Sequence, residues 1–333
     1  MPRSLPILAT EPASSRVAPG LVRLSLTDRC DLACVYCRPS RADGYFETRL
    51  SLSGWTTIID ELIASGITRV RITGGEPLLS PYLLDVVRDL AARKEVKDLA
   101  LTTNATQLAV LAAPLRDAGL RRLTISLDTL RAPRFFAITR GGRLNDVMQG
   151  IDAAAQIGFT ELKLNTVVMR NINDDELEDI VNFAWARNIT PRFIELMRVG
   201  EGARLPTNAL VSYEEMRSKL AAHALSKVAS RDTNRGPARY VTAANGRRVG
   251  FITGSTDTYC NGCDRMRVTA DGTFRPCLAT SDGTSARHSA ERGDGPSVRE
   301  AIASAWQKKP DGVTFRGCTE QSASAVSMRA TGG

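Results

Sequence analysis

Two groups of three cysteines are the residues in this sequence best suited to chemistry. The first group is Cys30, Cys34 and Cys37, with the spacing C-x3-C-x2-C. A chance occurrence of that spacing is on the order of a few per thousand chains of this length and cysteine content. Three thiolates on a tight loop can hold three irons of a 4Fe-4S cluster and leave the fourth iron open to a small molecule. Zinc is the alternative, but it needs a fourth ligand nearby, and neither His223 nor His288 is close in sequence.

The second group is Cys260, Cys263 and Cys277, with the spacing C-x2-C-x13-C. This spacing also suits a zinc knuckle or ribbon with Cys318 as the fourth ligand, and the residues alone leave that alternative open. The chain has seven Cys and two His. An odd number of cysteines in a chain that is not exported favours thiolate metal ligation over a disulfide framework, and scarce histidine argues against a histidine-based metal site.

The elements that must position these cysteines alternate between short β-rich runs and segments of helical period, which is typical of βα units around a parallel sheet. We expect six strands, at residues 21–27, 69–73, 98–103, 121–127, 161–168 and 192–196. They predict an α/β fold, a partial (β/α)6 TIM-type barrel, with a smaller C-terminal region that carries a second Fe-S cluster. In such barrels the chemistry lies at the carboxyl ends of the strands.

Apolar spacing predicts the helices between these strands. Residues 55–63 carry apolar side chains at i, i+3, i+4, i+7 and i+8, and we expect Ser53 to cap this helix. The spacing recurs in residues 177–185, after Asn173 and an acidic first turn at residues 174–176. Ser80-Pro81 predicts a further helix start, and apolar residues at 144, 147, 148 and 151 mark another helix.

The regular pattern fades after Met197. We therefore expect an N-terminal extension at residues 1–20, the partial barrel at 21–198 and the C-terminal region at 199–333. Asn245-Gly246 predicts a hairpin turn between residues 239–241 and 249–252. Residues 227–248 hold six Lys or Arg against one Asp, which suits either a solvated loop or a segment near an anionic ligand.

Length and composition are those of an ordinary globular protein of about two domains, with 333 residues, 43% apolar and 24% charged. No run approaches the roughly 18 apolar residues of a membrane span, and the start lacks a secretory h-region, so we expect a cytoplasmic protein. An organellar targeting segment in residues 1–20 is the alternative. The net charge of +8 suggests an anionic partner and leaves open whether it is a nucleotide, a nucleic acid or a membrane.

Several motifs resemble those of a known family. The first cysteine loop, with the aromatic Tyr36 before its last Cys, resembles the signature of radical S-adenosylmethionine (SAM) enzymes. The chain resembles most closely the GTP 3',8-cyclase family of molybdenum cofactor biosynthesis. The matching motifs are LSLTDRC at 24–30, RITGGEPL at 71–78, LTTN at 101–104, SLD at 126–128, RFIE at 192–195, the second cysteine group and the terminal Gly332-Gly333.

The resemblance implies two 4Fe-4S clusters and SAM as cofactors. Cys30, Cys34 and Cys37 would hold the first cluster, whose open iron binds SAM and whose electron cleaves it to methionine and a 5'-deoxyadenosyl radical. Cys260, Cys263 and Cys277 would hold the second cluster, whose open iron engages the guanine. The SAM contacts implied are the backbone of Tyr36 at the adenine, Gly75 at the methionyl group, Ser126 and Met197.

The resemblance also implies the GTP contacts, at Arg23, Arg71, Thr102, Lys163, Arg265, Met266 and Arg267, with Arg192 a further candidate. Arg265 and Arg267 alternate on an extended segment and so point to one side, where their forked guanidinium groups suit phosphate oxygens. The resemblance implies that Arg265 and Arg267 are catalytic residues, together with Cys30, Cys34 and Cys37. For each basic residue taken alone, a surface ion pair is the ordinary explanation.

The implied reaction removes the hydrogen at C3' of the GTP ribose, and the carbon radical attacks C8 of guanine. The product is (8S)-3',8-cyclo-7,8-dihydroguanosine 5'-triphosphate. The implied partners are an electron donor, a downstream cyclic pyranopterin monophosphate synthase and a second copy of the chain, with no nucleic acid and no membrane. The two terminal glycines would thread into the active site. Residues 321–331 depart from the family pattern, and Cys318 has no family role, so we take it as a free thiol.

Two other functions fit the sequence less well. A two-cluster radical SAM enzyme that modifies a peptide would usually carry more C-terminal cysteines than the four present here. A metal-binding protein that binds nucleic acid through basic patches would require the cysteine loop to be accidental. With only 5% aromatic residues, the chain also lacks the stacking side chains of a single-strand binding groove.

Overall fold

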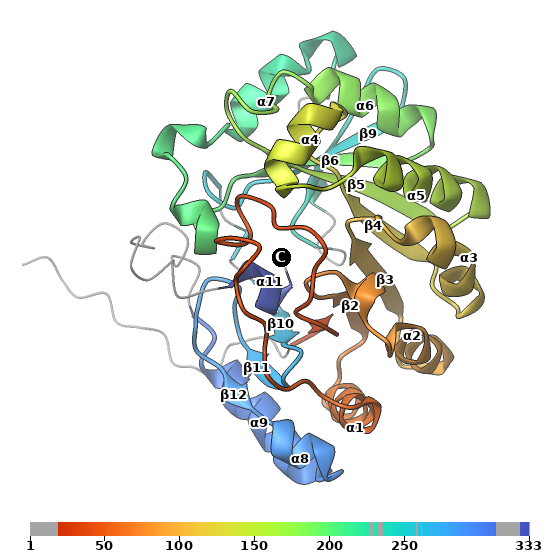
Figure 1. Cartoon of the computed structure of the whole chain (residues 1–333), viewed down its shortest axis with the longest axis vertical. Coiled ribbons are helices and arrows are strands. Elements are labelled where there is room, and N and C mark those ends of the chain that lie inside the picture. The colour runs from red at the N-terminus through yellow and green to blue at the C-terminus, as the bar shows by residue number, and fades with distance from the viewer. Residues whose placement is uncertain are drawn as a thin grey trace, which may run out of the picture.

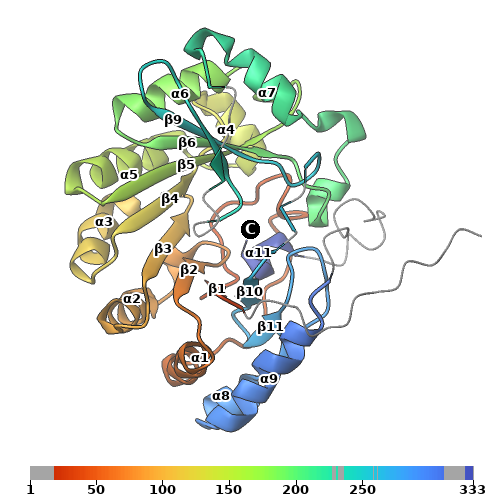
Figure 2. The ribbon, with the colours of Figure 1, turned by 180° about the vertical axis from the view of Figure 1, so that it is seen from behind.

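The computed structural model describes residues 19–226, 230–231, 236–257, 259–260, 262–310 and 327–332. Six parallel strands follow one another in a curved sheet, and the helices between them lie on its outer face (Figure 1). The inner face surrounds an open centre, in which the last described helix lies when the molecule is viewed from either side (Figure 1, Figure 2). The predicted α/β fold with a partial barrel is confirmed.

The six barrel strands agree with the predicted runs to within two residues at each end. They are β1 (Leu21–Ser25), β2 (Arg69–Thr73), β3 (Asp98–Thr103), β4 (Arg122–Ser126), β5 (Glu161–Val168) and β6 (Thr190–Glu195). Each is hydrogen-bonded in parallel to the next. Because all six strands are parallel, their carboxyl ends lie at one end of the barrel, as the predicted fold requires.

The C-terminal region adds strands to both edges of the same sheet. They are β7 (Ser230–Arg231), β8 (Arg239–Thr242), β9 (Arg248–Ile252), β10 (Arg265–Val268), β11 (Thr273–Arg275) and β12 (Thr284–Ser285). β10 pairs in parallel with β1, and β9 pairs in parallel with β6. The predicted hairpin is present as β8 and β9, with Gly246 at a φ of +79° in the turn. The second cysteine group therefore approaches the barrel at its β1 edge.

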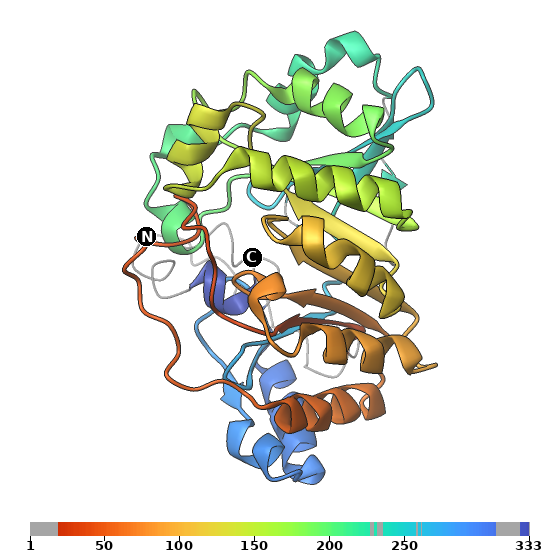
Figure 3. The same ribbon diagram turned by 45° about the vertical axis from the view of Figure 1, so that its right-hand side comes forward.

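The helices other than the last lie on the outer face of the sheet or along its edges, whereas the last lies inside the barrel (Figure 1, Figure 3). They are α1 (Leu52–Ala64), α2 (Leu83–Ala92), α3 (Leu108–Asp117), α4 (Ala132–Thr139), α5 (Leu144–Ile157), α6 (Leu177–Ala186), α7 (Tyr213–Lys219), α8 (Arg287–Glu291), α9 (Gly295–Gln307) and α11 (Met328–Thr331). Short 3-10 turns are η2 (Pro77–Leu79), η3 (Gly200–Ala203), η4 (Thr207–Ala209) and η5 (Ala221–His223). No helix in the described part of the chain is long and apolar enough to cross a lipid bilayer.

Three predicted helix starts are wrong by a few residues. Ser51, and not Ser53, caps α1, because its hydroxyl accepts from the backbone N–H of Gly54. Ser80-Pro81 lies in a turn after η2, and α2 begins only at Leu83. The acidic residues 174–176 precede α6 instead of forming its first turn. In the last case the Asn173 side chain is bonded to the backbone of Met169 and Val167, and so shapes the loop instead of the helix end.

The strands separate an apolar face from a polar one. Side chains such as Leu24, Ile72 and Leu164 are completely buried between the sheet and the helices. Their neighbours in sequence, Arg23, Arg71 and Lys163, point the other way, into the barrel. Since side chains alternate along a strand, one hydrophobic core fixes the direction of every polar side chain on the inner face.

Candidate functional site

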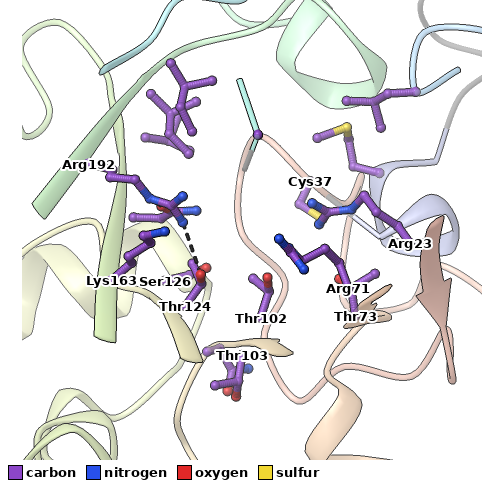
Figure 4. Close-up of a pocket in the computed structure, with 18 of the residues that line it drawn as sticks. Arg23, Cys37, Arg71, Thr73, Thr102, Thr103, Thr124, Ser126, Lys163 and Arg192 are labelled. Carbon is purple, nitrogen blue, oxygen red and sulfur yellow. Dashed lines mark hydrogen bonds between the residues drawn. The ribbon is translucent and has the colours of Figure 1, made fainter. Parts of the chain in front are cut away.

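A cavity of about 300 Å³ fills the inside of the barrel, a size that suits a small-molecule site. Side chains from β1 to β6, from the first cysteine loop and from the C-terminal region line it. The predicted site residues among them are Arg23, Cys30, Cys34, Tyr36, Cys37, Arg71, Gly75, Thr102, Ser126, Lys163, Arg192, Met197, Arg265 and Arg267. In Figure 4, Arg23 and Arg71 face Lys163 and Arg192 across a floor of threonine and serine hydroxyls.

Met266 does not line the cavity. Its side chain is completely buried in the core on the other face of β10. The alternation that turns Arg265 and Arg267 inward turns Met266 outward. A contact between Met266 and a ligand in the cavity would therefore fall to its backbone.

The first cysteine loop is held against the end of α4 and against the loop that follows β4. The backbone N–H of Val35 donates to the carbonyl of Ile138 at 3.0 Å. The Tyr36 hydroxyl donates to Asp128 at 2.7 Å, and Asp128 also accepts from the backbone of Val167. Burial raises the pKa of Asp128 to about 6, although both hydrogen bonds oppose it. Asp128 ends the SLD motif, so this motif fixes the direction of the cysteine loop.

The three thiols of this loop are free and partly buried. Burial raises the pKa of Cys37 to about 11 and raises the pKa values of Cys30 and Cys34 as well. A bound metal cluster reverses that bias, because its positive charge deprotonates a coordinating thiol. Three thiols on one short loop, open to the cavity, therefore fit a cluster with one iron directed at a ligand.

The GGEP turn after β2 packs directly against the start of the cysteine loop. The backbone N–H of Gly75 donates to Thr27 at 2.7 Å, and a Cβ at Gly75 would collide with the carbonyl of Arg29. Glu76 is buried and accepts from Thr103 and from the backbone of Asn104, both at 2.7 Å. Burial raises its pKa to about 7. The turn thus ties β2 and β3 to the cysteine loop, and Gly75 needs its missing side chain for that contact.

Arginines on three neighbouring strands point into the cavity together. Arg23 on β1 lies in register between Arg71 on β2 and Arg267 on β10. Burial, together with the charges of Arg267, Arg265 and Arg71, lowers the pKa of Arg23 well below its usual range. Burial also lowers the pKa of Arg267 to about 10. Like charges held this close in a buried site raise its free energy, and a polyanionic ligand would relieve that cost.

The facing wall carries Lys163 on β5 and Arg192 on β6 (Figure 4). Arg192 donates to Asn165 at 2.8 Å and to Thr124 at 3.1 Å. Burial and the neighbouring charge of Arg192 lower the pKa of Lys163 to about 8. Cations thus reach the cavity from both sides of the barrel.

The second cysteine group lies at the β10 edge, just outside the residues that line the cavity. Its thiols are free and partly buried. Arg265 donates to the sulfur of Cys263 at 3.1 Å. Burial raises the pKa of Cys263, but Arg265 and Lys309 outweigh it and lower the pKa overall. Lys309 donates to the carbonyls of Arg265 and Pro276, and so joins the segment after Cys263 to the segment before Cys277.

No three His, Cys, Asp or Glu side chains in the described residues lie close enough to hold a single metal ion. Each thiolate of a 4Fe-4S cluster binds a different iron, so the two cysteine groups do not have to meet that condition. Cys318, Gly333, residues 1–18 and parts of the basic run 227–248 lie outside the described residues.

Residues 327–332 dock inside the barrel. Arg267 donates to the carbonyl of Thr331 at 2.7 Å and to that of Gly332. A Cβ at Gly332 would collide with Thr73, and the residue has a φ of +73°. Arg329 is buried and pairs with Asp28 on the cysteine side. The departure of residues 321–331 from the family pattern thus does not prevent residues 327–332 from packing against the site.

Sequence patterns alone did not single out several side chains of this site. Tyr259 lines the cavity under the guanidinium of Arg265, and its hydroxyl is 3.6 Å from the sulfur of Met197. Arg122 and Arg329 also line it. The position of Tyr259 directly before Cys260 was an available signal, whereas nothing near Arg329 in the sequence indicates its burial.

Two family models match the chain. The radical SAM superfamily matches residues 24–184, and the family described as molybdenum cofactor synthesis C matches residues 189–315. A GTP 3',8-cyclase of Ectopseudomonas mendocina is 41% identical over 94% of this chain and 95% of its own length. GTP 3',8-cyclase 1 of Pseudomonas aeruginosa is 42% identical over 87% and 89%, and the GTP 3',8-cyclase of Petrotoga mobilis is 38% identical over 88% and 92%.

Solved structures of lower identity share the fold. SuiB of Streptococcus suis bound to SAM matches with a TM-score of 0.60 at 16% identity, over 90% of this chain and 68% of that one. The structure of anSMEcpe with bound SAM matches with a TM-score of 0.57 at 14% identity, over 92% and 88%. At these identities the match concerns the arrangement of helices and strands.

Proposed function

The chain belongs to the GTP 3',8-cyclase family of radical SAM enzymes, and we propose that its cavity brings SAM and GTP together between the two cysteine groups. The activity is the conversion of GTP to (8S)-3',8-cyclo-7,8-dihydroguanosine 5'-triphosphate in molybdenum cofactor biosynthesis. The cofactors are two 4Fe-4S clusters and SAM. The roles of single residues are proposals, and the structural observations below support them.

On the SAM side, Cys30, Cys34 and Cys37 would hold the first cluster. When bound, the cluster supplies the electron that cleaves SAM to methionine and the 5'-deoxyadenosyl radical. The remaining proposed SAM contacts are the backbone of Tyr36, Gly75, Ser126 and Met197. All four line the cavity. The Tyr36 hydroxyl donates to Asp128, which follows β4, and the Gly75 backbone donates to Thr27, three residues before Cys30.

On the GTP side, the observation that carries the proposal is the row of partly buried arginines that line the cavity. Arg23, Arg71 and Arg267 occupy adjacent register positions, and burial and mutual repulsion lower the pKa of Arg23. A triphosphate brings about four negative charges, which would favour the charged form of every guanidinium and give each a forked pair of acceptors. Lys163, Arg192, Arg265 and Thr102 complete the proposed set, and Met266 could contribute only backbone atoms.

Cys260, Cys263 and Cys277 would hold the second cluster, beside the proposed nucleotide contacts. Arg265 supports this arrangement, because one guanidinium lines the cavity and also donates to the sulfur of Cys263. A guanine that reaches this cluster would leave its triphosphate near the arginine row. The docked Gly332 would leave room for the reacting groups, where a side chain would collide with Thr73.

The proposed partners beyond GTP are an electron donor, a downstream cyclic pyranopterin monophosphate synthase and a second copy of the chain. The synthase follows from the chemistry, because the cyclised nucleotide must be rearranged to reach the cofactor. The cytoplasm is the proposed location. Thiolate ligands of iron persist there, since cytosolic thiols are kept reduced.

An anaerobic assay tests the function. The chain is reconstituted with iron and sulfide and given reductant, SAM and GTP, and 5'-deoxyadenosine and the cyclised nucleotide are measured together. We expect about eight irons per chain and deuterium transfer from C3'-labelled GTP into 5'-deoxyadenosine. About four irons would overturn the two-cluster assignment, and absent deuterium transfer would overturn the abstraction site. SAM cleavage that ignores GTP would instead point to a peptide or other substrate.

A further inference from the structure

Five charged side chains of alternating sign form a row across the sheet from β2 to β5, near the amino ends of these strands. In spatial order they are Arg71, Asp98, Arg122, Glu161 and Lys163. The two ends of this row are proposed GTP contacts. The three side chains between them have no role in the function described so far.

Each member of the row touches the next. Asp98 pairs with Arg71 through one carboxylate oxygen and with Arg122 through the other. Arg122 also donates from Nε to Glu161 at 2.5 Å, and the other oxygen of Glu161 lies 2.8 Å from the ammonium of Lys163. All five side chains are at least 70% buried, which limits screening by solvent. One guanidinium, that of Arg122, therefore joins the two halves of the row.

The row forms a wall between two hollows. Arg71 and Lys163 line the cavity proposed for GTP, and Asp98 lines a second hollow of about 580 Å³ at the amino ends of the strands. Arg122 and Glu161 line both. The second hollow also carries Lys97 and Thr160, and we assign it no ligand.

We propose that Arg122 is a positioning residue: it shares Asp98 with Arg71 and Glu161 with Lys163, which keeps both outer cations available to a triphosphate. The positive charge of Arg122 offsets part of the negative charge of Asp98 and of Glu161, so each carboxylate attracts its outer cation less than it would without Arg122. Without Arg122, Asp98 would pair with Arg71 alone and Glu161 with Lys163 alone. Each outer cation would then be neutralised by its own carboxylate, and GTP would bind less tightly. This proposal rests on the assignment of GTP to the cavity.

Because Arg122 lines the cavity, a direct contact with GTP must be separated from positioning. A direct contact that is lost with Arg122 cannot return when Glu161 is neutralised. Positioning makes the opposite prediction, because a neutral residue at 161 releases Lys163. The Arg122→Lys variant separates positioning from a simple effect of the positive charge at residue 122 on GTP affinity. A lysine keeps that charge but cannot bridge two carboxylates with a planar fork.

The experiment measures the affinities of GTP and SAM for the reconstituted holoenzyme by equilibrium dialysis without reductant, together with the melting temperature. The variants are Arg122→Met, Arg122→Lys and the double variant Arg122→Met/Glu161→Gln. The matched control is Arg88→Met, which removes an exposed arginine that pairs with Asp85 on α2. We expect Arg122→Met to weaken GTP about tenfold, as charged groups in contact typically couple, and to leave SAM affinity unchanged. The lysine variant should lose part of the affinity, and the double variant should regain the part that Lys163 contributes, because Asp98 still pairs with Arg71.

Any of the following results would overturn the proposal. Unchanged GTP affinity in Arg122→Met means that the outer cations do not depend on Arg122. Full affinity in Arg122→Lys reduces the effect to charge alone, and a double variant as weak as Arg122→Met indicates direct contact. Equal loss of GTP and SAM binding with a lower melting temperature indicates a structural role. If the wild-type holoenzyme does not bind GTP, the proposed function itself is wrong. The wild-type measurement in the same assay therefore distinguishes that failure from a failure of the role of Arg122.

Discussion

Arg329 and Asp28, 301 positions apart in the sequence, form a buried ion pair between the end of the chain and the start of the cysteine loop. The Arg329 guanidinium donates to the backbone carbonyl of Asp28 at 2.9 Å and to its carboxylate at 3.0 Å. Its other nitrogen reaches Asp43 at 3.0 Å, and the Tyr45 ring lies 4.8 Å from the guanidinium carbon. The short helix α11 is thus fastened to the segment that carries the first three cysteines.

Replacing Arg329 with Met should release the end of the chain from the barrel. Removing one partner of a buried pair costs several kcal/mol, more than a four-residue helix can recover elsewhere. We expect the yield of cyclised nucleotide per 5'-deoxyadenosine to fall by about tenfold, because Gly332 would leave its place beside Arg267. The ratio of the two products in one assay measures this. Arg299→Met, which removes an exposed partner of Glu61, is the control, and an unchanged ratio in Arg329→Met would contradict the prediction.

The affinity for GTP should fall as the pH rises from about 7 to about 9. Burial, with the charge of Arg192, lowers the pKa of Lys163 to about 8, so Lys163 loses its proton within this interval when no ligand is bound. A bound triphosphate favours the charged form and raises this pKa. The complex therefore holds a proton that the free protein releases, and affinity drops by about tenfold over the two units.

The Lys163→Arg variant tests the assignment of that slope. Arginine stays charged throughout this range, so the affinity of the variant should be level between pH 7 and pH 9. Equilibrium dialysis of GTP at several pH values measures both proteins. A slope that persists in the variant would assign the titration to another group.

Replacing Lys309 with Met should destabilise the second cluster selectively. Its ammonium donates to Arg265 at 2.7 Å and to Pro276 at 2.8 Å, and so holds together the two segments that carry Cys263 and Cys277. We expect the iron content to fall from about eight toward about four per chain, with the signal of the first cluster retained. Iron analysis and electron paramagnetic resonance measure this. Lys308→Met, which removes an exposed neighbour, should keep all the iron, and equal iron in both variants would refute the role of Lys309.

The sequence predicted the barrel well because its strands repeat a local pattern. The runs at 69–73, 98–103 and 161–168 coincide with β2, β3 and β5, and the cysteine groups follow from spacing alone. The alternation argument also fixed Arg265 and Arg267 on one side. The same alternation turns the Met266 side chain to the other side, so strand geometry adds to the implied GTP contact of Met266 that only its backbone could make it.

The rest depended on contacts between residues distant in sequence. The cap of α1 is the exception, because Ser51 and Ser53 both suit the position, and only the hydroxyl of Ser51 meets the N–H of Gly54 three residues later. Asp98, Arg122 and Glu161 are ordinary charges at strand starts until the register brings them together. β10 joins β1 across more than two hundred residues, a pairing that no local pattern encodes.

Replacing Gly332 with Ala should abolish most product formation, and Gly246→Ala provides a control for backbone conformation. Both glycines have a positive φ, +73° and +79°, where a Cβ costs roughly 1–2 kcal/mol. A Cβ at Gly246 would meet no atom within 4 Å, whereas one at Gly332 would collide with Thr73 and lie 2.7 Å from the hydroxyl of Ser25. We therefore expect Gly246→Ala to lower the free energy of unfolding without changing the product ratio, and Gly332→Ala to lower that ratio by at least about tenfold. If the two variants lose product equally, backbone strain and not the collision inside the barrel explains the effect, and the docked position of Gly332 has no part in the reaction.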